Sequence, residues 1–252
     1  MSRDAWSQWW TSIVPARWTQ HYTTHWKHRI AWQLLGAATV AAIALALFAS
    51  IGEDVFNHES GSVDDAVRSW MLAHQTPFLF TLFTGITNAG GTAPIAVLTA
   101  LASLWLWRVR GRHTAAGAIV APVLAMVLFN AIKFGFGRVR PVGALHFALV
   151  SYAFPSGHAT VSCATAVTVA YVLWRERLIS GRVAATVALM FPLLVGFSRT
   201  YLDVHWATDV IGGWCVGLFV AGLSSVVYEH LRRDPVIDAS EGHDSPSGAR
   251  VA

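Results

Sequence analysis

Residues 30–51 read IAWQLLGAATVAAIALALFASI and contain no Asp, Glu, Lys or Arg. About 20 apolar residues in a helix are enough to cross the hydrocarbon core of a bilayer. The run is too long for the apolar region of a cleaved signal peptide, and no A-x-A site closes it. We therefore predict that residues 30–51 form a retained first membrane span.

The rest of the chain repeats this pattern. Charged residues make up 13% of its 252 residues, against roughly 25% in an average soluble domain. Three more long stretches lack Asp, Glu, Lys and Arg, at 69–107, 141–174 and 210–228. The predicted fold is an all-α integral membrane bundle of six transmembrane helices. The expected spans are 30–51, 92–108, 115–134, 157–174, 183–199 and 207–229.

One further apolar piece, Pro77–Asn88, is short for a span. It is followed by Gly90-Gly91, a pair typical of a turn. We expect a re-entrant or interfacial helix here. If this piece crossed the membrane, the total would be seven spans and the N-terminus would change sides relative to the loops downstream.

The two ends of the chain differ from the spans. Residues 1–29 combine Trp and Ile at helical spacing with basic residues, which predicts an amphipathic segment on the membrane surface. The tail, 230–252, is rich in Asp, Ser, Gly and Pro and is expected to be disordered. The predicted organisation is therefore an N-terminal segment 1–29, a six-span membrane domain 30–229 and a tail 230–252.

The distribution of basic residues predicts the orientation. They gather before the first span, between the second and third, between the fourth and fifth, and after the sixth, and parity places these four regions on one side. The positive-inside rule makes that side cytoplasmic, with both termini there. Clusters of this kind explain the net charge of +4 without nucleic acid as a partner. The residues concerned are Arg17, Lys27, Arg29, Arg108, Arg110, Arg112, Arg175, Arg177, Arg182, Arg232 and Arg233.

A second set of polar residues runs against this orientation rule. These residues stand at span ends or in loops that parity brings to the opposite, extracytoplasmic face. They include four cations, two imidazoles and one carboxylate. The set is Lys133, Arg138, Arg140, Ser156, Gly157, His158, Ser198, Arg199, His205 and Asp209.

Such a set indicates a phosphate site. Lys and Arg bind charged oxygens, and a helix that begins at Ser156-Gly157 offers free backbone N–H groups to an anion. His205 and Asp209 are four residues apart, so on a helix the carboxylate can orient the imidazole and leave its other nitrogen nucleophilic. His158, on another span, is then available as a general acid.

Taken singly, each feature has an ordinary explanation. Lys133 or Arg199 alone could be a snorkelling membrane anchor, and Ser156-Gly157 alone could be a helix cap. His205 with Asp209 alone could be half of a metal site. Their gathering on one face, against the charge rule, favours a functional site.

These residues resemble a known family. Lys133 with six residues before Arg140-Pro141, then Pro155-Ser156-Gly157-His158, then Ser198-Arg199 with His205 and Asp209, is similar to the three-part signature of the type 2 phosphatidic acid phosphatase and vanadium haloperoxidase superfamily. The signature region is 133–209, which makes 30–229 a membrane phosphatase domain by resemblance.

The resemblance implies a role for each signature residue. It makes His205 the nucleophile, Asp209 its support and His158 the acid for the leaving group. The phosphate-binding residues that it implies are Lys133, Arg140, Ser156, Gly157 and Arg199, with Arg138 and Ser198 as secondary candidates.

The expected activity is hydrolysis of a lipid phosphate or pyrophosphate through a phosphohistidine. Undecaprenyl pyrophosphate, phosphatidylglycerol phosphate and phosphatidic acid all fit, and the oligomeric state stays open. Asp203 and Asp209 are too few carboxylates for a hard-metal cage, so we expect no metal and no cofactor. The location expected is the cell inner membrane, with the site on its outer side. A lipid phosphotransferase that uses the same site is the alternative. A lipid transporter would instead predict charged or broken helices near mid-membrane.

Overall fold

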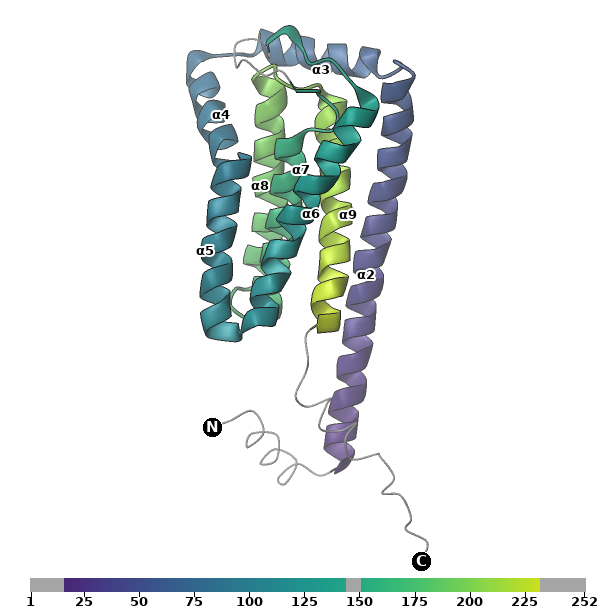
Figure 1. Cartoon of the computed structure of the whole chain (residues 1–252), viewed down its shortest axis with the longest axis vertical. Helices are drawn as coiled ribbons and strands as arrows, with labels where there is room; N and C mark the ends of the chain where they lie inside the picture. The colour runs from purple at the N-terminus through teal and green to yellow at the C-terminus, as the bar shows by residue number, and fades with distance from the viewer. Residues whose placement is uncertain (1–15, 144–150, 232–252) are drawn as a thin grey trace, which may run out of the picture.

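The structure is a computed structural model that describes residues 16–143 and 151–231, with side chains described from residue 32. This part of the chain is all-helical, as predicted, and Figure 1 shows its helices arranged as a bundle. The helices are α2 (Ala16–Phe56), α3 (Gly61–Ala73), α4 (Pro77–Ala89), α5 (Thr92–Arg110), α6 (Arg112–Phe136), α7 (Gly157–Arg175), α8 (Gly181–Tyr201) and α9 (Ala207–Leu231).

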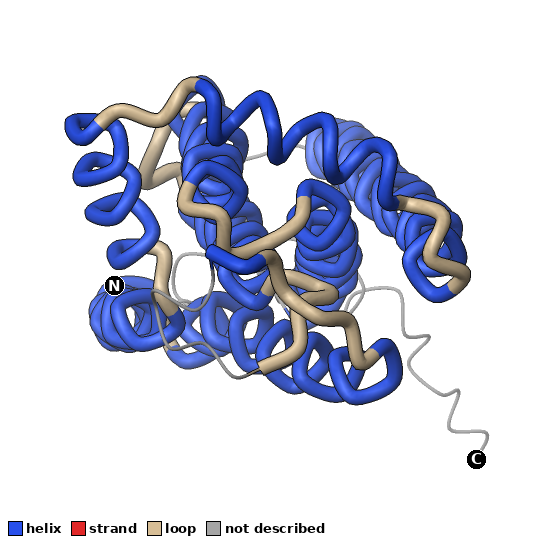
Figure 2. The backbone as a smooth tube through the Cα atoms, turned by 90° about the horizontal axis from the view of Figure 1, so that it is seen from above, coloured by secondary structure: helices blue, strands red, loops and turns tan. Residues whose placement is uncertain are grey.

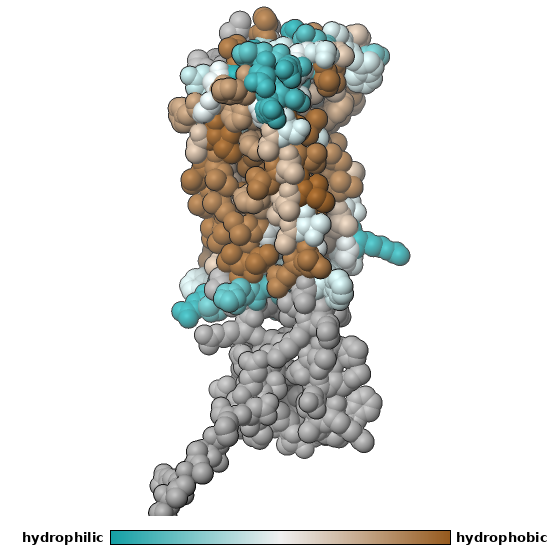
Figure 3. All heavy atoms as spheres, turned by 90° about the vertical axis from the view of Figure 1, so that its right-hand side faces the viewer, coloured by the Kyte–Doolittle hydropathy of each residue, from teal (hydrophilic) through white to brown (hydrophobic). Residues whose placement is uncertain are grey.

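All six predicted spans are confirmed as helices long and apolar enough to cross a membrane. They cover Trp32–Phe56, Thr92–Arg110, Arg112–Phe136, Gly157–Arg175, Gly181–Tyr201 and Ala207–His230. The outer surface carries a broad hydrophobic band with hydrophilic residues above and below it (Figure 3). Apolar side chains are exposed on several spans, for example Val97, Val127 and Leu189, as expected of surfaces that face lipid. The chain is a multi-pass membrane protein.

The short helix predicted near 77–88 is α4. Thr76 begins it, since its side chain accepts a hydrogen bond from the Leu79 N–H and Pro77 occupies the first turn. Figure 1 shows α4 above α5, the two running one after the other along the same edge of the bundle. The break between them falls at Gly90 and Gly91, where the chain changes helix without reversing its course.

The helix α3 was not predicted. It lies across one end of the bundle, between the upper ends of α2 and α4 (Figure 1). Its residues combine buried Asp64 and Met71 with exposed Val63 and Trp70. The sequence analysis predicted no helix here, because the acidic residues of 53–65 obscured the helical periodicity.

The two described ends of the chain lie at the same end of the bundle, as the even number of predicted spans requires. The Ala16 end of α2 and the Leu231 end of α9 lie at the same end of the bundle as the α5–α6 and α7–α8 connections (Figure 1). Gly111, with φ 97°, and Gly137, with φ 60°, make the turns before and after α6. Residues 137–143, 151–156 and 202–206 lie at the opposite end, which Figure 2 views from above.

The predicted terminal segments are only partly described. Residues 1–15 and 232–252 lie outside the described residues, so the expectations for most of the N-terminal segment and for the tail fall outside the structure. From Ala16 the backbone is already helical and runs without a break into the first span. The second half of the segment 1–29 is thus continuous with that span.

The core of the bundle is the contact between α7 and α9. Adding a Cβ atom at Gly217 would bring it to 2.6 Å from Cys163 Cβ and 2.9 Å from the Thr160 carbonyl oxygen, and Gly213 is equally tight against the Ser156 carbonyl oxygen at 2.7 Å. A Gly-x-x-x-Gly pair of this kind lets two membrane helices approach closely. The two backbones are therefore packed directly against each other.

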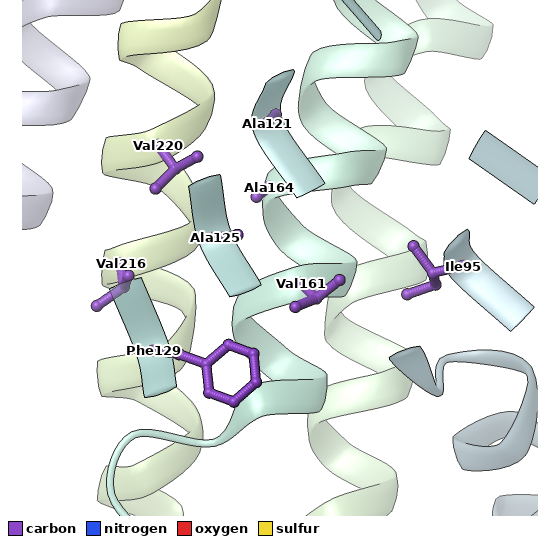
Figure 4. Packing of buried hydrophobic residues seen from close by; sticks show 8 residues of the cluster. All are labelled: Ile95, Ala121, Ala125, Phe129, Val161, Ala164, Val216 and Val220. Atoms are coloured by element: carbon purple, nitrogen blue, oxygen red, sulfur yellow. The ribbon is translucent and has the colours of Figure 1, made fainter. Parts of the chain in front are cut away.

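Apolar side chains from four helices complete this core. Figure 4 shows the cluster, with α6 in front of α7 and α9. It consists of Ile95, Ala121, Ala125, Phe129, Val161, Ala164, Val216 and Val220. Most of these side chains are small, so α6 can lie close to α7. Phe129 is the largest side chain of the cluster and lies at its end toward the site.

At the other end, α7 and α9 are joined by a buried ion pair. Arg175 donates from Nε and from Nη2 to the carboxylate of Glu229, the second at 2.6 Å, and the Tyr171 hydroxyl donates to the same carboxylate at 2.7 Å. Breaking such a buried pair by removing one partner is strongly destabilising. The two helices are thus held at both of their ends.

We predict that Gly217→Ala destabilises the protein. The added methyl group would press on Cys163 and on the α7 backbone, and overpacking of this kind costs about 1–3 kcal/mol. The measurement is the apparent melting temperature of purified protein in detergent. Gly36→Ala is the matched control, because a Cβ there would have no heavy atom within 4 Å. Equal melting temperatures for the two variants would contradict the close contact.

Candidate active site

His205 lies in the connection between α8 and α9, and Asp209 lies in the first turn of α9. His205 Nδ1 is 3.2 Å from Asp209 Oδ2, and its Nε2 is 2.8 Å from Arg140 Nη1. A carboxylate accepts and a guanidinium only donates, so Nδ1 carries the proton and Nε2 keeps its lone pair. The imidazole therefore presents its lone pair toward a cationic side chain.

The surroundings keep this imidazole neutral. His205 is buried, with 3% of its surface exposed. Burial lowers its pKa well below the ordinary 6.5, and the positive charges of Arg140, Arg199 and Lys133 lower the pKa further. At neutral pH the lone pair on Nε2 is thus available for reaction.

Asp209 is fully buried and held by three donors. Its Oδ2 accepts from the Trp206 N–H at 2.9 Å as well as from His205, and its Oδ1 accepts from Arg138 Nη1 at 2.6 Å. These bonds fix the carboxylate at the start of α9. The orientation of the His205 ring follows from that of the carboxylate.

Arg140 reaches the site from the connection after α6. Its Nε donates to the Ser151 carbonyl at 2.7 Å and its Nη1 donates to the Val204 carbonyl at 2.8 Å. These bonds hold the guanidinium beside His205 Nε2. Arg140 is partly buried, and this burial lowers its pKa below the ordinary value because desolvation disfavours the charged form.

Lys133 and Arg199 are two further buried cations, in the last turns of α6 and α8. Lys133 Nζ donates to the Tyr152 carbonyl at 2.9 Å, and Arg199 Nη1 donates to the Thr87 hydroxyl at 2.7 Å. The Nε of Arg199 is buried and has no hydrogen-bond partner among the described residues. A buried donor of this kind favours an acceptor supplied from outside the chain.

The partners of the cations divide them into two groups. The acceptors found for Lys133, Arg140 and Arg199 in the described chain are carbonyl oxygens, two hydroxyls and an imidazole, all of them neutral. Arg138 and Arg68 instead form ion pairs with carboxylates. The first group keeps its positive charge uncompensated, which is what binding of a phosphate requires.

Ser156 and Gly157 begin α7 beside His205 and Asp209. Ser156 is buried and donates its backbone N–H to the Asp209 carbonyl at 2.9 Å, while its Oγ has no partner among the described residues. Gly157 packs tightly on Phe129, since a Cβ there would lie 2.9 Å from the ring. His158 follows in the same turn, partly buried, and its Nε2 would lie 3.7 Å from a Cβ placed on Gly91.

The two secondary candidates lie differently. The Ser198 hydroxyl donates to the Val195 carbonyl of its own helix at 2.6 Å and is fully buried. Arg138 bridges Asp209 and Asp64, at 2.6 Å and 2.5 Å. Both side chains are engaged within the protein, so neither is aimed at an incoming phosphate.

Two residues at this end of the bundle were missed by the sequence analysis. Thr87 of α4 accepts from Arg199, and Asp64 of α3 accepts from Arg138. A threonine on an apolar helix carries no signal of this kind. For Asp64 a signal existed, because it stands four residues before Arg68 and thus on the same helix face, but no helix was predicted at these residues. In the described ranges no group of three or more His, Cys, Asp or Glu could hold a metal ion.

Comparison with known proteins agrees with this arrangement. The family model of the PAP2 superfamily matches residues 114–233. This range contains the three signature motifs, the helices α7 to α9 and α6 except for its first two residues. This part of the chain is therefore similar to the PAP2 superfamily.

Relatives with curated names are lipid phosphatases. The chain is 29% identical over 177 residues to phosphatidylglycerophosphatase B of Bacillus subtilis, covering 68% of this chain and 86% of the relative. It is 31% identical over 121 residues to an undecaprenyl-diphosphatase of Sulfolobus acidocaldarius, covering 46% of this chain and 55% of that relative.

The fold is also found in a solved structure. A crystal structure of a transmembrane PAP2-type phosphatidylglycerolphosphate phosphatase from Bacillus subtilis matches with a TM-score of 0.71 and 25% identity. The match covers 77% of this chain and 98% of the other. The matched share is larger than the range of the family model, so the likeness of the bundle to this solved structure extends beyond residues 114–233.

The depressed pKa of His205 predicts a pH-dependent stability. Below its ordinary pKa of 6.5 the imidazole binds a proton in the unfolded chain but stays neutral in the folded protein, so the folded state loses stability as the pH falls. We expect wild-type protein to lose more thermal stability than His205→Gln between about pH 7.5 and about pH 5. Melting temperatures in detergent measure this difference. Equal losses would show that the ring is not held neutral.

Proposed function

We propose that this protein hydrolyses a lipid phosphate or lipid pyrophosphate through a phosphohistidine. The observation that carries the proposal is the position of His205 Nε2, whose lone pair faces Arg140 while Nδ1 is held by Asp209. The named relatives support the choice of substrate class, since they are phosphatases of membrane lipids. Six spans and little protein outside them suit a substrate that stays in the bilayer.

In the first step His205 Nε2 attacks phosphorus. The N–P bond forms while the bond from phosphorus to the lipid oxygen breaks. His158, at the start of α7, donates the proton that this oxygen needs. Lys133, Arg140 and Arg199 stabilise the charge on the three equatorial oxygens, together with the helix start at Ser156 and Gly157. Asp209 stabilises the positive charge that develops on His205.

In the second step water replaces the lipid. His158 now accepts a proton from the water molecule as its oxygen attacks phosphorus, and the N–P bond breaks. Phosphate leaves and His205 returns to the neutral form with its proton on Nδ1. Transfer to a second lipid hydroxyl would make the protein a phosphotransferase, and this would be detected as a labelled lipid product.

The proposed location is the cell inner membrane, with the site on its outer side. The helix ends that flank the α5–α6 and α7–α8 connections carry several Arg residues and lie at the end opposite the site (Figure 1). Basic connections remain in the cytoplasm. The cations at the site end are engaged in the site or in ion pairs, which accounts for their position on the outer side.

We predict that purified protein in detergent releases phosphate from at least one of undecaprenyl pyrophosphate, phosphatidylglycerol phosphate and phosphatidic acid. Activity should persist with EDTA, because the proposed steps use only side chains. In His205→Ala it should fall by several orders of magnitude, as for removal of other nucleophiles. Phosphate release is measured colorimetrically.

The control for this assay is His230→Ala, at the far end of α9, which should keep wild-type turnover. Wild-type turnover in His205→Ala would disprove the phosphohistidine. Loss of activity with EDTA, restored by a divalent ion, would indicate a metallophosphatase instead.

We predict that Asn57 and Ser180 lie on opposite sides of the membrane. Both residues are exposed, at the two ends of the bundle. Each is replaced singly by Cys in a background without the buried Cys163 and Cys215. An impermeant thiol reagent applied to intact cells should label position 57 only. Labelling of position 180 alone would reverse the orientation and place the site in the cytoplasm.

A further inference from the structure

The helix α3 contacts the segment that carries His205. Asp64 and Arg68 stand four residues apart and thus on one face of α3. Asp64 reaches the first turn of α9, and Arg68 reaches Asp203 in the connection before it. Neither residue belongs to the signature motifs. The helix therefore holds both flanks of His205 from outside the family motifs.

Asp64 is a buried carboxylate with its hydrogen bonds satisfied at the start of α9. Only 1% of its surface is exposed. Its Oδ1 accepts from the Thr208 N–H at 2.9 Å, and its Oδ2 accepts from the Thr208 hydroxyl at 2.6 Å and from Arg138 Nη2 at 2.5 Å. The carboxylate thus fixes the first turn of α9, one residue before Asp209.

Arg138 connects the two buried carboxylates. Nη2 donates to Asp64, and Nη1 donates to Asp209 at 2.6 Å. Two carboxylates share one guanidinium, so one negative charge is left to face His205. Without the charge of Asp64, Arg138 would neutralise Asp209 completely. Asp209 would then be a weaker acceptor for the proton on His205 Nδ1 and a weaker stabiliser of an imidazolium.

Arg68 acts on the other flank. It donates two hydrogen bonds to Asp203, at 2.7 Å and 2.9 Å, and Asp203 holds φ at 55° in the turn after α8. The guanidinium groups of Arg68 and Arg138 also lie 5.8 Å and 5.7 Å from the centre of the Trp206 ring. Trp206 follows His205 directly, so these contacts restrict the backbone on both sides of the imidazole.

We propose that Asp64 is a positioning residue for the reaction. Through Arg138 it sets the orientation and the charge of the Asp209–His205 pair, without touching the substrate. This proposal rests on the proposed phosphatase function. A purely structural role would make Asp64 matter for folding only, and the experiment separates the two.

The test variant is Asp64→Asn, and the control is Asp65→Asn at the exposed neighbouring position. We expect kcat of Asp64→Asn to fall roughly 10- to 100-fold, the range found for residues that hydrogen-bond to the ligands of catalytic metal ions. KM should stay within about twofold, because Lys133, Arg140 and Arg199 still bind the phosphate. Asp65→Asn should retain wild-type kcat and KM.

Vanadate supplies a readout that a structural role would not change. A vanadate bound at His205 resembles the transition state, and its binding depends on the orientation of the imidazole. The inhibition constant of vanadate should rise in Asp64→Asn by the same factor as kcat falls. The inhibition constant of inorganic phosphate, which needs only the cations, should not change.

A double-mutant cycle tests the route through Arg138. If Asp64 acts through this guanidinium, the double variant Asp64→Asn/Arg138→Ala should be no slower than Arg138→Ala alone. Multiplicative losses would show that Asp64 acts by another route and would overturn the proposal. If Asp64→Asn does not yield folded protein, Asp64→Glu replaces it, with the same expected split between kcat and KM.

Failure of the positioning role of Asp64 can be distinguished from failure of the proposed phosphatase function. If wild-type protein releases no phosphate from any lipid of the panel, the proposed function fails. If wild-type protein is active and Asp64→Asn keeps its kcat, or loses activity only in proportion to its folded fraction, the positioning role is disproved while the phosphatase stands.

Discussion

The packing of α7 against α9 is the contact on which the site depends. Gly213 and Gly217 let the two backbones approach so closely that the Ser156 N–H reaches the Asp209 carbonyl. This places the helix start of the second motif beside the His205–Asp209 pair of the third. In a membrane this closeness cannot come from the hydrophobic effect between helices, because lipid tails are as apolar as leucine. It comes from van der Waals contact between small residues.

The second constraint is the cost of burying charge. Every cation at this end is buried or partly buried, and an unpaired buried charge is expensive. The structure meets this cost in two ways. Arg138 and Arg68 take carboxylate partners and become part of the framework. Lys133, Arg140 and Arg199 take neutral oxygen and nitrogen acceptors, which satisfy donors without cancelling charge, so these three remain suited to an anion.

Much of this could be predicted from the sequence. The spans follow from apolar length, and parity alone brings the motif residues to one face of the membrane. Both arguments use periodicity and counting, which tolerate errors of a few residues at each boundary. The partners of the motif residues could not be predicted. Asp64 and Thr87 lie 74 and 112 residues from Arg138 and Arg199 in the chain, and pairing at that separation depends on side-chain geometry that no local pattern records.

The ion pair between Arg175 and Glu229 has a consequence for how a substrate gains access. This pair joins α7 and α9 near one end, and the Ser156–Asp209 contact joins them at the other. The two helices therefore form one rigid unit. Sliding or rotation between them would break a buried ion pair or separate two closely packed backbones. We therefore expect the movement that admits a bulky lipid to occur in the helices around this unit. Two glycines follow α4, and α3 lies across the end of the bundle. The positions of the α7 helix start and of the His205–Asp209 pair relative to each other can thus stay unchanged while a lipid binds.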